Sequence, residues 1–524
     1  MTFFPEKKYS RQIYLSGIFL LVTGLPLSMF AMSVSQFVLL GAWIIEGNIS
    51  KKIKRAFTQP VFLVLAGVYF LHVLGLIHTA DFKYAVNDLR IKIPLLLLPL
   101  IFFTSPPLSQ KEYHSVLAVF IAAVFISALI SVMVYAGIIH RPLHDIRDIS
   151  IFISHIRLSL LVCIAIICCI YFLKEKQTGN VRISMLILIV AFTAFLVLLE
   201  SFTGLFILSC IGIYILFSFL NKQSPIIART GLIAVIIIIV ISAYKFYIYI
   251  FVDSLKPAII HIHELPQVTA LGHPYTHDIS RNDVENGNPV WIKICEAELD
   301  SAWNARSHLS YSGKDERGQF LKYTLIRYLA SKNLPRDAEG ISHLDENEIR
   351  AIEMGIANVD YAHLSDIKAR VHQLAWEYRQ YRLNNDPTGH SVMQRFEFWK
   401  TALFIISKHP LTGVGTGDVQ KEFDKAYIES NSRLELSNRL RAHNQFLTMT
   451  VAFGLIGGCY FIFSLIYPAI HLRNPGFLFS TFLIVALLSM IAEDTLETQA
   501  GVTFFSFFNS FFISQSKKFM NSYY

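Results

Sequence analysis

The chain has 524 residues, of which 53% are hydrophobic and only 16% are charged, and its formal net charge is +8. An ordinary soluble domain is about 25% charged. The apolar residues occur in runs of about 17–25, long enough to cross the hydrocarbon core of a bilayer. This composition excludes a soluble enzyme, a disordered chain and a disulfide scaffold. It predicts an all-α, polytopic membrane protein.

Twelve apolar runs are predicted to be transmembrane helices, because a backbone in lipid must satisfy its own hydrogen bonds. They lie at 12–30, 32–47, 59–78, 90–104, 113–138, 156–173, 183–199, 203–221, 229–252, 443–469, 476–493 and 498–514. A long polar segment separates the first nine from the last three. The predicted organisation is an N-terminal membrane region (1–252), a large, mainly helical loop domain (253–441) and a C-terminal membrane region (442–524).

Basic residues predict the orientation, because Lys and Arg accumulate in cytoplasmic loops. The N-terminus carries Lys7, Lys8 and Arg11, and nearly every even-numbered run leads into a basic connection. Both termini are therefore expected in the cytoplasm and the loop domain outside. Residues 253–441 contain 23 Lys and Arg and 26 Asp and Glu, whereas the rest of the chain contains 23 and 12. The net charge therefore reflects orientation, and no nucleic-acid partner is expected.

The loop domain carries several helix signals. Ser342 precedes Asp345 and Glu346 and then an apolar repeat (Ile349, Ile352 and Ile356), which predicts a capped helix, and 364–381 has the pattern of an amphipathic helix. Residues 282–288 have turn chemistry. Residues 396–408 are amphipathic but too short to span, which predicts an interfacial helix with Trp399 at the level of the lipid headgroups.

A glycine-rich run, Gly413-x-Gly415-x-Gly417, follows this segment. It lacks the Gly-Lys-Ser/Thr of a phosphate-binding loop and has no strand before it, so nucleotide binding is disfavoured. A flexible turn or a set of backbone N–H groups facing a phosphate is the better interpretation. Gly415 is therefore a candidate binding residue.

Several cations lie next to predicted spans on the outer side, where positive residues are normally avoided. They are Arg90, Lys92, Arg157, Arg395 and Arg441, with His443 beside the last of them. Each cation alone could extend to lipid phosphates. Together they predict a site for an anionic lipid headgroup, because guanidinium groups match the oxygens of a diphosphate.

His443 precedes Asn444 at the start of a predicted span. A histidine at such a position is often structural, but beside arginines it could act as a general base toward a sugar hydroxyl. Glu493, Asp494 and Glu497 lie in the turn between the last two spans. They either pair with the arginines or serve as the acid/base group in place of His443.

A second group of histidines lies at the start of the loop domain, with two acidic residues close by: His261, His263, His273, His277, Glu264 and Asp278. A His-x-His-Glu run could bind a metal ion, but no second motif supports it. No metal or other cofactor is expected. The loop domain has one cysteine, Cys295, so it cannot contain an internal disulfide.

Several motifs follow one another along the chain: Pro26-Leu27-Ser28, Arg157-x-Ser159-Leu160, Arg395-x-x-x-Trp399, Pro410-x-x-Gly413-x-Gly415-x-Gly417, and His443-Asn444 ahead of Gly454 and Gly457-Gly458. This series resembles the bacterial O-antigen ligase family, which includes O-antigen ligases, O-antigen polymerases and related protein O-glycosyltransferases. The loop domain resembles versions from Bacteroidetes-like bacteria. One departure is Ser201-Phe202-Thr203-Gly204, where many family members carry an arginine.

The resemblance implies a glycosyltransferase of the bacterial inner membrane that moves a glycan from undecaprenyl diphosphate to a periplasmic acceptor hydroxyl. The first acceptor to consider is lipid A-core, as in an O-antigen ligase. A polymerase or a protein O-oligosaccharyltransferase remains an alternative. Arg157 and Arg395 would hold the diphosphate, and His443 would deprotonate the acceptor in an inverting, metal-independent displacement. The remaining binding candidates are Arg90, Lys92, Arg441, Asn444, Trp399 and Gly415.

A transporter or glycan flippase is an alternative of another class, because twelve spans also suit such proteins. The charges next to the spans gather at the outer face rather than the midplane. No inverted repeat or pair of Gly/Pro-broken helices is evident. These features favour a transferase.

Overall fold

The computed structural model describes residues 7–142, 146–175, 178–221, 225–252, 265–281, 283–360, 366–384, 387 and 391–516. The chain forms two compact units, Met1–Arg229 with Arg395–Tyr524, and Thr230–Gln394. The divisions fall inside helices α11 (Pro225–Tyr247) and α18 (Ser391–Lys408). Residues 395–441, which were assigned to the loop domain from the sequence, belong to the first unit.

Each of the twelve apolar runs is helical, as expected for an all-α membrane protein. The helices are α1 (Lys7–Leu27), α2 (Met29–Ile45), α4 (Pro60–Leu74) with η1 (Gly75–His78), α6 (Pro94–Thr104), α7 (Gln110–Tyr135), α8 (His155–Lys174), α9 (Gly179–Leu198), α10 (Phe202–Leu220), α11 with η3 (Ile248–Val252), α20 (Gln445–Leu472), α21 (Phe477–Ala492) and α22 (Gln499–Ser514). Shorter elements of the first unit are α3 (Ile49–Thr58), α5 (Phe82–Lys92), η2 (Ile146–Ile149), α19 (Val419–Glu429), η6 (Leu436–Asn438) and η7 (Thr495–Glu497).

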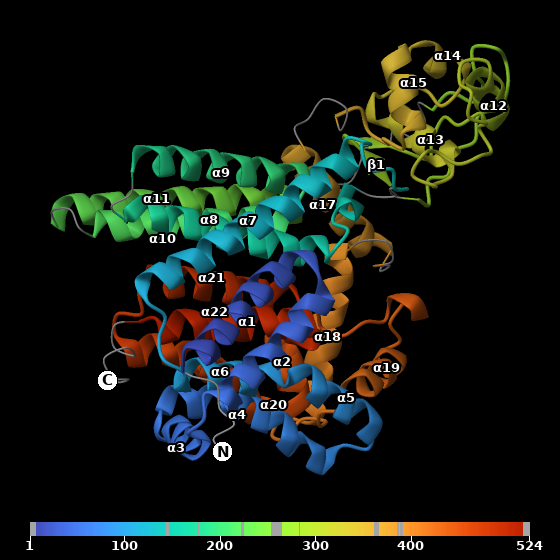
Figure 1. The fold of residues 1–524 in the computed structure, drawn as a ribbon. Helices are drawn as coiled ribbons and strands as arrows, with labels where there is room; N and C mark the ends of the chain where they lie inside the picture. The colour runs from blue at the N-terminus through green and yellow to red at the C-terminus, as the bar shows by residue number, and fades with distance from the viewer. Residues whose placement is uncertain are drawn as a thin grey trace. The chain divides into compact units, whose positions relative to one another are not determined.

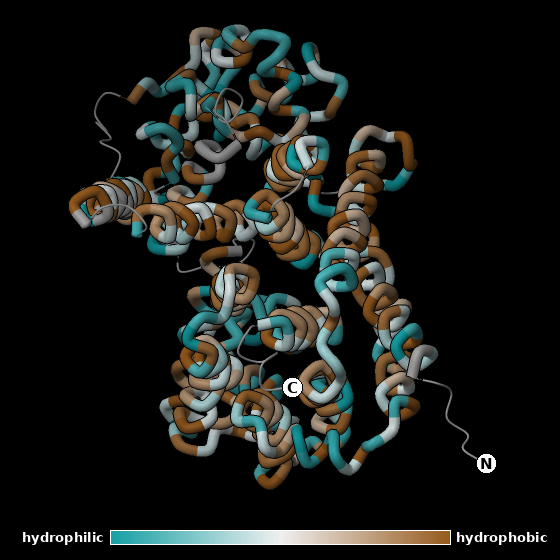
Figure 2. The backbone as a smooth tube through the Cα atoms, turned by 60° about the vertical axis from the view of Figure 1, so that its left-hand side comes forward, coloured by the Kyte–Doolittle hydropathy of each residue, from teal (hydrophilic) through white to brown (hydrophobic). Residues whose placement is uncertain are grey.

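Six helices of the described residues are long and apolar enough to cross a membrane: Pro60–His78, Gln110–Tyr135, His155–Lys174, Gly179–Leu198, Phe202–Leu220 and Gln445–Leu472. Helices α2 and α3 meet at a bend of 110° and would give a seventh span if they are counted as one. Figure 2 shows that apolar residues run along the long helices. The chain is therefore a polytopic helical membrane protein, and the number twelve stays a prediction.

The core of the first unit is built around α22, which packs against α6 and α21 (Figure 1). Nearly every residue of α22 is buried, and its phenylalanines stack closely, with Phe507 and Phe511 having ring centroids 5.2 Å apart. Helix α8 is also largely buried. In contrast, α9 leaves apolar side chains such as Ile187 and Val190 exposed, as a helix facing lipid would.

Helix α20 is broken at Gly454, whose φ of +67° and ψ of −173° are not helical. The glycine-rich run and the residues just before it form backbone hydrogen bonds with α20 at this break. Val414 N–H donates to the carbonyl of Val451, Gly415 N–H donates to that of Ala452, and Leu455 N–H donates to that of Pro410. These hydrogen bonds give partners to backbone groups at the break, as a helix within a membrane requires.

Glycine is needed at this junction because two backbones touch. A Cβ atom on Gly454 would lie 2.2 Å from the carbonyl oxygen of Leu411, and one on Gly413 would lie 2.4 Å from the backbone of Ala452. Both glycines also have positive φ. The run Gly413–Gly417 thus packs against the break in α20.

The second unit has its own small core around Trp303, Tyr328 and Leu325. Its elements are β1 (Val284–Glu285), β2 (Asn288–Pro289), α12 (Glu296–Asn304), α13 (Leu321–Ser331), α14 (Ala338–Ser342), α15 (Glu346–Glu353) and α17 (Asp366–Asn384). The predicted capped helix is confirmed as α15, where Asp345 and Glu348 form a reciprocal capping box. The predicted turn at 282–288 contains the tight β1–β2 hairpin, with Asn286 and Gly287 at positive φ.

Candidate functional site

The three predicted catalytic residues lie around one turn of the first unit. Arg157 is in the first turn of α8, Arg395 is near the start of α18, and His443 lies two residues before α20. The turn that follows α21 places Glu493 among them (Figure 1). Residues far apart in the sequence are thus gathered by helix ends.

Glu493 joins Arg395 to His443. Its Oε1 lies 3.2 Å from an Arg395 terminal nitrogen, and its Oε2 lies 3.4 Å from Nδ1 of His443. The predicted pairing of the acidic turn with the arginines is therefore present. Because one carboxylate contacts both side chains, the guanidinium and the imidazole are held at a fixed separation.

The backbone of His443 is held in an unusual conformation. Its φ is +45°, a value that side-chain-bearing residues seldom adopt. Asp494 accepts a hydrogen bond from the His443 N–H at 3.2 Å and another from the Thr448 hydroxyl at 2.7 Å. The ring stacks on Phe398, with centroids 5.6 Å apart. These contacts fix the direction of the imidazole.

Neighbouring charges and burial shift the pKa values of His443, Glu493 and Asp494. The hydrogen bond to Glu493 raises the pKa of His443 above its ordinary value, although burial acts against this. Burial alone would raise the pKa of Glu493, but His443 and Arg395 outweigh it and lower that pKa. Burial and the charge of Glu497 raise the pKa of Asp494 to about 6. The contact between the two side chains therefore favours the imidazolium form of His443 and the carboxylate form of Glu493.

Arg157 lies on a cavity that Glu493 and Asp494 also line. The other walls are mostly apolar and come from α1, α8 and α22, with Leu25, Leu160 and Phe504 among them. One Arg157 nitrogen donates to the hydroxyl of Thr498. The cavity thus combines an apolar wall with one guanidinium and two carboxyl groups.

Arg395 has an unused hydrogen-bond donor. Its Nε is buried and makes no hydrogen bond with any described residue, and the same is true of Nε1 of Trp399. The two residues are four apart on α18, so they lie on the same face of that helix. Buried donors without partners are rare, and an anionic or hydroxyl-rich ligand would satisfy them.

A second cluster centres on Glu497. Its Oε2 contacts Arg441 at 2.9 Å and Lys92 Nζ at 3.2 Å, and Lys92 also contacts Asp88 at 2.5 Å. Lys92 has a side chain only 1% exposed. Because both of its partners are within the protein, Lys92 acts here as an internal counter-charge.

Replacing Lys92 with Met should destabilise the protein by about 3–5 kcal/mol, because it leaves the buried Asp88 without its cation and Glu497 with Arg441 alone. The neighbouring Arg90 is exposed and donates to Asn87, so Arg90→Ala should leave stability unchanged. Resistance of the detergent-purified protein to heat measures both effects. A Lys92→Met protein as stable as wild type, but with weaker donor binding, would instead make Lys92 a ligand-binding residue.

The remaining candidates have local roles in the described structure. Asn444 caps α20, its side chain accepting from Leu447 N–H at 3.1 Å and donating to the carbonyl of Ile491. Gly415 uses its N–H to bond α20. Arg90 is exposed and does not contact the Glu493 group. Helix α18 begins before the predicted 396–408 segment, and its buried Phe398 belongs to the core of the unit.

The histidine group of the loop domain is only partly described, because 261–264 lie outside the described residues. His277 is held by backbone contacts to Pro266 and Lys293. His273 contacts Glu298 instead, which the sequence does not indicate.

The comparison with known families bears on the same segment. Residues 355–462 match the model of the O-antigen ligase family. The chain carries an O-antigen ligase domain. The resemblance predicted from the sequence is thereby confirmed, and the matched range contains Arg395, the glycine-rich run and His443. No match is found among curated proteins.

The O-antigen ligase match covers residues 355–462 and is a likeness of that segment to a family of glycosyltransferase-like membrane proteins. The matched range does not include Arg157, Glu493 or Glu497. The fold brings Glu493 to Arg395 and His443, Arg157 to the same cavity as Glu493, and Glu497 to Arg441. Asp88, four residues before Lys92, is a partner that helix spacing could have revealed.

Proposed function

We propose that the chain transfers a glycan from undecaprenyl diphosphate to an acceptor hydroxyl at the periplasmic face of the bacterial inner membrane. The observation that carries this proposal is the single carboxylate of Glu493, which joins Arg395 to His443 beside the cavity of Arg157. The preferred acceptor is lipid A-core, as for an O-antigen ligase.

The donor step needs a place for a lipid chain and a diphosphate. The apolar walls of the cavity suit the lipid, and Arg157 lies at its polar part. Arg395 adds a buried Nε–H that no described residue accepts. Both guanidinium groups would stabilise the diphosphate as the anomeric C–O bond breaks. Because these cations neutralise the leaving group, we propose that the reaction needs no metal ion.

The acceptor step needs a base. Neutral His443 would take the proton of the acceptor hydroxyl as its oxygen attacks the anomeric carbon, and polyprenyl diphosphate would leave with the bonding electrons. Glu493 would stabilise the imidazolium that forms, in the manner of a carboxylate orienting a catalytic histidine. A single displacement of this kind inverts the anomeric centre.

The pH profile of transfer should reflect this pair. Since only neutral His443 can act as a base, the rate should fall as pH drops through the pKa of His443, which Glu493 raises above 6.5. Glu493→Gln removes the largest cause of this rise; Asp494 still raises the pKa of His443, while burial and Arg395 lower it. The midpoint of the acid limb should therefore move to lower pH in the variant. An unchanged midpoint in a rate-versus-pH series would contradict the pairing.

The acceptor is tested in cells. Deleting the gene should remove long O-chains from lipid A-core and leave them on the lipid carrier, and wild type should restore them. Single repeats on the core would indicate a polymerase, and loss of glycan from proteins would indicate a protein O-oligosaccharyltransferase. If the lipopolysaccharide and glycoprotein profiles are both unchanged, the transfer proposal fails for these acceptors and transport becomes the better interpretation.

A further inference from the structure

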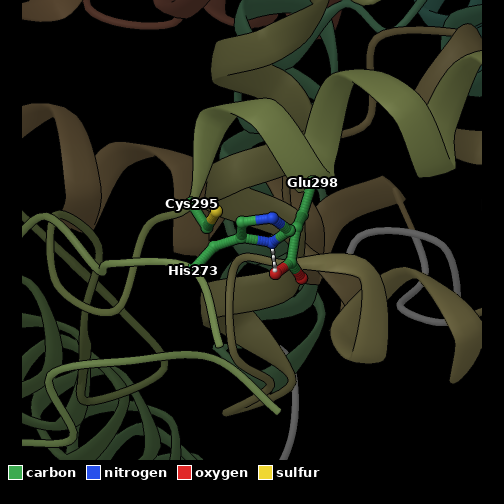
Figure 3. A group of neighbouring side chains, drawn as sticks. All are labelled: His273, Cys295 and Glu298. Carbon is green, nitrogen blue, oxygen red and sulfur yellow. Dashed lines mark hydrogen bonds and ion pairs between the residues drawn. The ribbon is translucent and has the colours of Figure 1, made fainter. Parts of the chain in front are cut away.

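Three metal-binding side chains converge in the second unit. Figure 3 shows His273, Cys295 and Glu298 directed toward one another. One possible ligand atom from each lies within 4.8 Å of those of the other two. Imidazole nitrogen, thiolate sulfur and carboxylate oxygen are the donors that zinc uses in proteins.

Local structure brings two of the three together. Cys295 is the residue before α12, and Glu298 is three positions later in its first turn. Residues three apart on a helix share a face, so both side chains point the same way. His273 comes from the preceding loop, and its Nδ1 lies 2.8 Å from Oε1 of Glu298.

The surroundings hold the carboxylate in place. Oε1 of Glu298 accepts from the Thr269 hydroxyl, and Oε2 accepts from the N–H of Ala338 at 3.2 Å. Glu298 and Cys295 are each only 5% exposed, whereas the His273 side chain is 57% exposed. Metal ligands are commonly oriented by such outer hydrogen bonds. The exposed imidazole leaves a path for an ion to enter.

We propose that His273, Cys295 and Glu298 bind a divalent transition-metal ion of the zinc class. Such an ion would replace the His273–Glu298 hydrogen bond, with Nδ1 and the thiolate as ligands after each loses a proton to solvent. Bond lengths of about 2.0–2.3 Å place tetrahedral donors roughly 3.3–3.6 Å apart. The distance of 2.8 Å between His273 Nδ1 and Glu298 Oε1 would widen slightly, and a separation near the 4.8 Å limit would shorten, movements that the exposed imidazole can make. Water would take the fourth position.

The ion would tie a loop to a helix. The loop around His273 is closed by the Thr269 N–H donating to the His273 carbonyl at 2.8 Å. A bond from His273 to the start of α12 would hold this loop on the second unit. The thiolate favours zinc, cobalt or nickel over Mg²⁺ and Ca²⁺, which prefer oxygen ligands.

The test uses the full-length protein in detergent, stripped with a chelator and titrated with Co²⁺. We expect one Co²⁺ per chain, a thiolate-to-cobalt charge-transfer band, and loss of that band when Zn²⁺ is added. Cys295→Ser should abolish the band. His273→Ala should weaken binding at least roughly tenfold, and it should leave folding intact because the side chain is exposed.

The matched control is His308→Ala. His308 is an exposed histidine of the same unit that contacts Glu353 at 3.1 Å, but no cysteine belongs to that described pair. It should bind Co²⁺ like wild type. The proposal is overturned if wild type shows no charge-transfer band, or if His273→Ala and His308→Ala bind Co²⁺ equally well.

Discussion

His443→Ala should lower the rate of glycan transfer by roughly 10²–10⁴-fold, the usual contribution of a positioned general base. The imidazole is held by Glu493 through its Nδ1 and by Phe398 through ring stacking, so its orientation is fixed before the acceptor binds. The rate is measured on purified protein with donor and acceptor in excess. His409→Ala is a suitable control, because His409 is exposed and follows α18 in the same unit.

Two outcomes would change the assignment of the base. Full activity in His443→Ala together with loss of activity in Glu493→Gln would make Glu493 the base and His443 its positioning partner. Full activity in both variants would exclude the pair from the chemistry. Size-exclusion chromatography of each variant shows whether a lost activity reflects lost folding.

Arg157→Ala and Arg395→Ala should each lower the transfer rate by roughly 10²–10³-fold, as the loss of one preorganised charge at a developing anion usually does. Arg395→Lys should recover only part of the rate, because an ammonium group keeps the charge but not the planar set of donors. The loss should appear in the rate with saturating donor, since the charge on the diphosphate grows as the sugar bond breaks.

A nearby cation provides the control for Arg395. Lys400 lies on the same helix, is largely exposed and contacts Glu397, so Lys400→Ala should transfer glycan like wild type. Equal activity of Lys400→Ala, Arg395→Ala and Arg157→Ala would remove the arginines from the mechanism and leave them as structural partners of Glu493 and Thr498.

The helical architecture was predictable because the backbone of an apolar run in lipid must form its own hydrogen bonds, and a helix provides them. Each of the twelve runs is helical for this reason. The break in α20 was harder to predict. The sequence indicates a flexible turn at Gly413–Gly417, but the need for glycine at 413 comes from its close approach to the backbone of Ala452, about forty residues along the chain.

The sequence indicates the candidate cations and the acidic turn that could pair with them, but not which pairs form. A cation beside a span has the same appearance in the sequence whether it faces lipid, ligand or protein. Lys92 proves to be buried between carboxylates, whereas Arg90, two residues away, is exposed. Glu493 and Glu497 are only four residues apart, yet they pair with different arginines, Arg395 and Arg441. Which carboxylate pairs with which cation depends on how the ends of the helices pack.

The most direct measurement is a transfer reaction with purified protein, a polyprenyl-diphosphate-linked glycan and lipid A-core, followed by mass spectrometry. Without nucleotide and with a chelator present, wild type should release one polyprenyl diphosphate for each glycan joined to the acceptor, and His443→Ala should release almost none. Passage of the intact lipid-linked glycan across a vesicle membrane, with no cleavage of the donor by wild type, would contradict glycan transfer.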